Sequence, residues 1–150
     1  MLFRSLQLGN LLRQDDVDRA IKIHQMLTVR KRLTKETRIE IFKSLALDYE
    51  QINDLTKAKI ELEKILELDK SNIWANSFLL SLAEKTEDWD YAEKKAREMM
   101  KLKNFKDEIN LSKYTLKKGI DYLEKNNMEK AENLFRKAID ESPTFGEPYK

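Results

Sequence analysis

Cysteine is absent from this chain of 150 residues, and glycine, proline and histidine are scarce, with three, two and one copies. Without a thiol the chain forms neither a disulfide nor a thiolate zinc site, so nothing in it requires an oxidising compartment. So few glycines and prolines argue against a β-rich or a disordered chain, and the abundance of leucine, lysine, glutamate and alanine favours helix throughout. The composition predicts an all-α protein.

Motifs for catalysis, cofactor binding and membrane insertion are also missing. The sequence has no Gly-rich phosphate loop, no Walker motif and no metal-ligand spacing. Its single histidine, His24, has no cysteine, second histidine or obvious nucleophile as a partner. The longest apolar run is far short of a bilayer span, and no signal-peptide pattern opens the chain. We predict a non-enzymatic segment that uses no cofactor or metal and does not itself insert into a membrane.

The net charge is only +2, from 29 basic and 27 acidic residues, so no nucleic acid is predicted as a partner. The charge is nonetheless uneven, because residues 30–43 hold six basic residues against two acidic ones, and residues 94–106 hold six against one. Lysine-rich, solvated helix ends account for such stretches. The alternative is a patch for an anionic partner at Arg30, Lys31 and Arg32.

A spaced pattern of small and aromatic residues stands out near the C-terminus. Counted from Ser112, positions 8, 11, 20, 24, 27 and 32 hold Gly119, Tyr122, Ala131, Phe135, Ala138 and Pro143. Small residues let two antiparallel helices approach each other, and the aromatic residues fill the seam between them. The pattern resembles the tetratricopeptide repeat signature, with Thr115 and Lys118 in place of its tryptophan and leucine at positions 4 and 7.

The alanine of position 20 recurs after three further polar turns. Ala20, Ala58, Ala92 and Ala131 are 38, 34 and 39 residues apart, so two of the intervals carry insertions. We predict an α-solenoid of four helix-turn-helix repeats at about 2–29, 34–68, 72–102 and 107–142, with the start of a fifth repeat at 143–150. The repeats are expected to form one array with a right-handed superhelix, as a fragment of a longer protein.

Apolar periodicity predicts helices over 2–12, 17–29, 35–51 and 55–68, and the turn before Ala20 is expected to have lost one residue. His24 stands at position 24, where the signature has phenylalanine, so we predict a ring packed in a helix interface rather than a catalytic base. Repeat three departs from the signature with Leu80, Ala83 and Ala96. Its smaller seam is expected to be filled by larger side chains, which are Trp89, Tyr91, Met99 and Met100.

First helices line the concave surface of such arrays, and their exposed positions predict a partner-binding groove. These positions hold Lys43, Leu47, Glu50, Trp74, Ser77, Ser81, Lys113, Leu116 and Ile120. A mixed apolar and charged lining suits an extended peptide or a partner helix. Trp74 is the expected aromatic anchor, and the alternative is that it only packs against repeat two.

The first half of the chain carries a closer resemblance. LGNLLRQ at Leu8 to Gln14 and DVDRAIKIHQ at Asp16 to Gln25 are similar to the LGNLFR…VDRAIRIHQ segment of the lipopolysaccharide assembly protein B family. LTKETR, LALDYEQINDLTKA and the pair Asp88-Trp89 follow in the order that this family has. The resemblance covers residues 2–102 well and the remainder weakly.

In that family the repeats form a cytoplasmic domain with an N-terminal membrane helix and a terminal zinc ribbon, and neither is present in this sequence. The resemblance implies an adaptor that regulates turnover of the lipid A deacetylase through the membrane protease FtsH. We therefore predict a cytoplasmic protein-binding scaffold, tethered to the inner membrane by a segment absent here. The alternative is a structural array that self-associates as a homodimer through Leu2, Phe3 and Tyr149 and leaves its groove unused.

Overall fold

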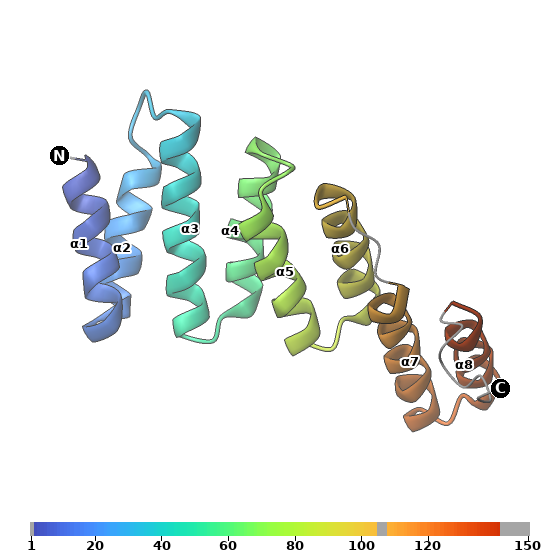
Figure 1. Ribbon diagram of the computed structural model, residues 1–150. Helices are drawn as coiled ribbons and strands as arrows, with labels where there is room; N and C mark the ends of the chain where they lie inside the picture. Colours follow the sequence, from blue (N-terminus) through green and yellow to red (C-terminus); the bar gives the residue numbers. More distant parts are fainter. Residues whose placement is uncertain (1, 105–107, 142–150) are drawn as a thin grey trace. The chain divides into compact units, whose positions relative to one another are not determined.

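The computed structural model describes residues 2–104 and 108–141, including all of their side chains except those of residues 108–110. This part of the chain folds into eight helices and no strand (Figure 1). The helices are α1 (Leu2–Asp15), α2 (Val17–Thr28), α3 (Lys35–Gln51), α4 (Leu55–Leu68), α5 (Ile73–Lys85), α6 (Trp89–Leu102), α7 (Glu108–Glu124) and α8 (Met128–Glu141). The predicted all-α repeat fold is confirmed. The expected start of a fifth repeat at 143–150 lies outside the described residues.

In each of the four helix pairs, one capping residue precedes the second helix. Asp16, Asp54, Asp88 and Asn127 each accept a hydrogen bond from the backbone N–H three residues later, at 3.1, 3.1, 3.3 and 3.3 Å. Such caps satisfy a backbone donor that the first helical turn leaves without an internal partner. Each cap stands four residues before a position-20 alanine, so turn and alanine recur as one unit.

The turns within the pairs also share their geometry, with one exception. Asn53, Glu87 and Asn126 immediately precede the caps of repeats two to four, and their φ angles of 59°, 58° and 59° are left-handed. Repeat one has no such residue, because α1 continues to Asp15 and only Asp16 separates it from α2. The predicted loss of one residue from this turn is confirmed, and α1 is longer than predicted for the same reason.

Small residues mark where paired helices approach. Ala20, Ala58 and Ala92 are fully buried and Ala131 is 1% exposed, as the repeat register predicts. A Cβ added to Gly119 would lie 2.6 Å from the ring of Phe135, so only glycine leaves room for the ring at position 24. Gly9 and the His24 ring make the equivalent contact in repeat one.

The chain divides into two compact units, Met1–Phe78 and Leu79–Lys150, with the boundary inside α5. In the first unit α1 packs on α2, α2 on α3 and α3 on α4. In the second, a core of Ala83, Ala92, Ala96, Leu111 and Tyr114 is covered by Leu80, Trp89, Tyr91 and Met100. The expectation that large side chains fill the seam of repeat three is confirmed for Trp89, Tyr91 and Met100, while Met99 is half-buried outside this cluster. That all four repeats form one array stays a prediction.

Candidate functional site

The first unit places Trp74 against repeat two while leaving part of its ring exposed. The Lys43 ammonium on α3 lies 4.7 Å from the centre of the Trp74 ring on α5. Phe78, one turn further along α5, also contacts the Trp74 ring, with ring centroids 5.3 Å apart and an interplanar angle of 54°. The sequence predicted Lys43 and Trp74 as groove residues, and the structure brings these two side chains into contact.

The remaining predicted residues of the first unit differ in exposure. Leu47 and Ser77 are half-buried, and Glu50 is exposed. Since Lys43, Leu47 and Glu50 lie three and four residues apart on α3, they share one helical face. This face is partly apolar and carries charges of both signs.

In the second unit α7 presents a row of apolar side chains. Leu116 is half-buried, and Ile120 and Leu123 are 44% and 41% exposed. Lys113 stands one turn before Leu116, with its ammonium 3.4 Å from the Glu84 carboxylate on α5. Ser81 is exposed one turn before Glu84.

Tyr114, beside Lys113, connects α7 to the same carboxylate. Its hydroxyl donates a hydrogen bond of 2.6 Å to Glu84. Burial, together with this hydrogen bond to an acidic group, raises the pKa of the Tyr114 hydroxyl. The hydroxyl therefore stays protonated and acts as a fixed donor.

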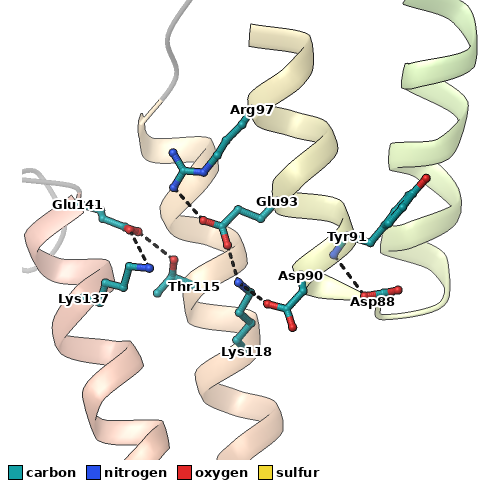
Figure 2. Close-up of polar contacts among 9 residues, drawn as sticks. All are labelled: Asp88, Asp90, Tyr91, Glu93, Arg97, Thr115, Lys118, Lys137 and Glu141. Atoms are coloured by element: carbon teal, nitrogen blue, oxygen red, sulfur yellow. Dashed lines mark hydrogen bonds and ion pairs between the residues drawn. The ribbon is translucent and has the colours of Figure 1, made fainter. Parts of the chain in front are cut away.

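The helices of repeats three and four are joined by ion pairs that the sequence analysis did not predict. Figure 2 shows the Lys118 ammonium on α7 between two carboxylates of α6, 2.5 Å from Glu93 and 2.7 Å from Asp90. Arg97 also binds Glu93, at 2.9 Å. Three residues before Lys118 on α7, the Thr115 hydroxyl donates to Glu141 of α8 at 2.9 Å.

These contacts explain the two positions at which repeat four departs from the repeat signature. Thr115 and Lys118 occupy the tryptophan and leucine slots, and each finds a carboxylate on a neighbouring helix. A buried polar side chain is stable only with such a partner. The apolar seam is replaced here by a matched set of polar side chains.

The ionisation of this network follows from its geometry. Burial disfavours the charged form of Glu93, but hydrogen bonds from Lys118 and Arg97 outweigh burial and lower the pKa of its carboxyl. Burial likewise acts against the charge of Lys118, but hydrogen bonds to Asp90 and Glu93 prevail and raise its pKa. Glu93 and Lys118 are therefore both charged at neutral pH.

A buried polar triad joins the first three helices. The carboxylate of Asp48 on α3 binds Nδ1 of His24 on α2 and, at 2.5 Å, Nε of Arg13 on α1. Side-chain exposure is 0% for His24 and Asp48 and 16% for Arg13. The His24 ring is packed in a helix interface, as predicted. Asp48 was missed, although it follows Ile41 and Leu45 at helical spacing on a buried stripe, where a carboxylate needs a partner.

Two negative findings apply to the described part of the chain. Within residues 2–104 and 108–141, no three His, Cys, Asp or Glu side chains gather in a way that could hold a metal ion. No helix in these ranges is long and apolar enough to cross a bilayer.

The family model of the tetratricopeptide repeat matches residues 44–72 and 117–145. Two crystal structures of MamA have the same helical-repeat fold. Each superposes with a TM-score of 0.56, at 17% and 16% identity, covering 93% and 99% of this chain and 77% and 79% of MamA. The chain is thus a tetratricopeptide-repeat protein.

Among such proteins it resembles lipopolysaccharide assembly protein B. It is 28% identical over 133 residues to that protein from Escherichia coli strain K12, a match that covers 88% of this chain and 34% of the relative. The protein from Haemophilus influenzae is 30% identical over 142 residues, covering 93% and 35%. The chain spans about a third of the length of these curated relatives. Repeats and resemblance together identify a scaffold for protein partners.

Proposed function

We propose that this chain is a non-enzymatic adaptor in lipopolysaccharide assembly, which regulates lipopolysaccharide synthesis by binding a protein partner and a membrane protease. The observation that carries the proposal is the similarity to lipopolysaccharide assembly protein B over 88% and 93% of the chain. The role places the chain in the cytoplasm, tethered to the inner membrane by a segment outside this sequence. It needs neither a catalytic residue nor a nucleic acid.

Each unit presents a proposed binding surface on the exposed face of its first helices. In the first unit it comprises Lys43, Leu47, Glu50, Trp74 and Ser77, and in the second Ser81, Lys113, Leu116 and Ile120. A tryptophan in contact with Lys43 and Phe78 has already lost much of its rotational freedom, so a partner covers it at a low entropic cost. Rigid aromatic side chains of this kind dominate interface energies.

The test measures binding of the chain to the purified lipid A deacetylase and to the membrane protease of the same organism. We expect Trp74→Ala to weaken binding of at least one of them by tenfold or more, since truncating a hot spot costs about 2 kcal/mol or more. The loss should persist at high salt, because an apolar anchor is not screened. Ile60→Ala is the matched control, since Ile60 is 47% exposed on α4, a second helix. A folded Trp74→Ala protein that binds both partners normally would overturn the groove assignment.

Self-association is a second candidate function, favoured by the face of α1. Phe3, Leu8 and Leu11 are 69%, 52% and 72% exposed, and a second copy of the chain would bury these apolar side chains. Leu2, which was predicted to contribute, is half-buried, and Tyr149 lies outside the described residues. Analytical ultracentrifugation across a range of protein concentrations distinguishes a homodimer from a monomer. A dimer that Leu11→Glu dissociates would support a homodimer, and a monomer at all concentrations would exclude it.

A further inference from the structure

The connection between α2 and α3 carries basic side chains without acidic partners. Arg30, Lys31 and Arg32 are exposed in this loop, and Arg38 is exposed one turn into α3. No carboxylate of the described residues forms an ion pair with any of these four cations. Some cations elsewhere in the first unit do form ion pairs, and these are Arg13, Arg19, Lys57 and Lys64.

The backbone conformation of the loop does not account for an arginine at the end of the basic triplet Arg30, Lys31 and Arg32. Arg32 has a φ of 63°, in the left-handed region. Glycine and asparagine adopt this conformation more easily than arginine does. The local backbone preference therefore does not explain why an arginine stands at this position.

A small pocket opens beside these cations. Thr28, Leu33, Arg38, Ile41 and Phe42 line a volume of about 130 Å³. Three of the five lining residues are apolar, and Ile41 is 1% exposed, so the pocket reaches the core of the unit. In the sequence, Thr28 and Leu33 flank the basic triplet.

The size of the pocket limits what it can hold. Sites for cofactors and drug-sized ligands have about 300–1,000 Å³, which is much larger. A cavity of about 150 Å³ lined by apolar side chains binds benzene, so the present volume suits a single aromatic or branched aliphatic side chain. Arg38 lines the pocket and would bind a carboxylate next to that side chain.

We infer that the α2–α3 connection is a second binding site, separate from the proposed groove, and that it takes an acidic peptide segment anchored by one apolar side chain. The four cations attract the acidic residues, and the pocket accepts the anchor. An anionic bilayer is the main competitor, because Met26 and Val29 beside the loop are 69% and 80% exposed. A bilayer surface, however, makes no use of a concave pocket that is as wide as one side chain.

The test uses the whole chain and a fluorescein-labelled synthetic peptide in which one phenylalanine is flanked on both sides by glutamates. Fluorescence anisotropy measures its binding at low and at high salt. A second peptide replaces the phenylalanine with serine, and a third replaces the glutamates with glutamines. We expect each change in the peptide to weaken binding by about tenfold or more, with the charge effect shrinking at high salt.

Two protein variants separate charge from pocket. The double variant Arg32→Glu, Arg38→Glu reverses exposed charges, and Thr28→Phe fills the pocket from its rim. Both should weaken binding of the first peptide by about tenfold or more. The control double variant Arg4→Glu, Lys22→Glu makes the same change in net charge at exposed positions of α1 and α2, and should leave binding within about twofold. Trp74→Ala should also leave it unchanged, because the groove is a different site.

Three results would overturn the inference. Equal binding of the phenylalanine and serine peptides would show that the pocket is not used. An equal effect of the control double variant would reduce the site to net charge. Binding to vesicles that contain phosphatidylglycerol, without measurable binding of any peptide, would assign the loop to a membrane surface instead.

Discussion

Replacing His24 with phenylalanine is the sharpest test of how the first unit is held together. The signature residue at this position is phenylalanine, so the sequence alone predicts that the change preserves or raises stability. The structure reverses this expectation, because His24 is a hydrogen-bond partner of the fully buried Asp48 carboxylate. Sterically the new ring should fit beside Gly9, since Gly119 accommodates Phe135 in the same way.

The magnitude follows from what the carboxylate loses. A hydrogen bond to a charged group contributes about 1.5–3 kcal/mol, and Arg13 still binds Asp48 after the substitution. We therefore expect His24→Phe to lower the free energy of unfolding by about 2 kcal/mol. Asp48→Leu should cost about 3–5 kcal/mol, because it leaves the His24 ring and the Arg13 guanidinium without their acceptor.

The double variant His24→Phe, Asp48→Leu should lose less free energy of unfolding than the two single variants lose in sum. With both members replaced by apolar groups, only Arg13 needs another partner. Its guanidinium already donates to the Asn10 side chain at 2.6 Å and to the Ser44 carbonyl at 3.1 Å. The double-mutant cycle should thus show a coupling energy of about 1.5 kcal/mol or more between His24 and Asp48.

Urea unfolding followed by tryptophan fluorescence measures these values. The chain has two tryptophans, and Trp74 lies in the first unit while Trp89 lies in the second. A Trp89→Phe background therefore reports the first unit alone. If His24→Phe leaves the unfolding free energy unchanged or raises it, Asp48 does not depend on His24 and the reasoning about the triad is wrong.

Three further outcomes are expected. Enlarging Ala58 or Ala131 to leucine should cost about 1–3 kcal/mol by overpacking, and unchanged melting of both variants would contradict the repeat register. Glu93 has a pKa below its usual 4.5, so its charge stabilises the second unit above that pH and the contribution disappears as the pH falls through the lowered pKa. Glu93→Gln should therefore destabilise the second unit at neutral pH and weaken the dependence of its urea midpoint on acid pH, whereas an unaltered pH profile would exclude the ion pair with Lys118. Glu87→Asn should stabilise by about 0.5–1 kcal/mol, because asparagine tolerates the left-handed turn that glutamate adopts at a φ of 58°; equal or lower thermal stability would refute that account.

The helices and their pairing were readable from the sequence. The predicted bounds of α3 and α4 agree with the structure, and the spacing of Ala20, Ala58, Ala92 and Ala131 identified the buried contact of each pair. These features are local, because a cap, a turn and a small residue act over a few neighbouring residues. The repetition of the pattern makes each instance evidence for the others.

The polar partners were decided by the tertiary structure. His24 and Asp48 are 24 residues apart, and Lys118 and Glu93 are 25 apart, so no helical spacing connects them. The sequence marked only one member of each pair, as a departure from the signature at a position that is normally apolar. The packing of neighbouring helices decides which carboxylate pairs with such a polar residue. Charged groups are stable in a core only where packing brings a partner within hydrogen-bond distance.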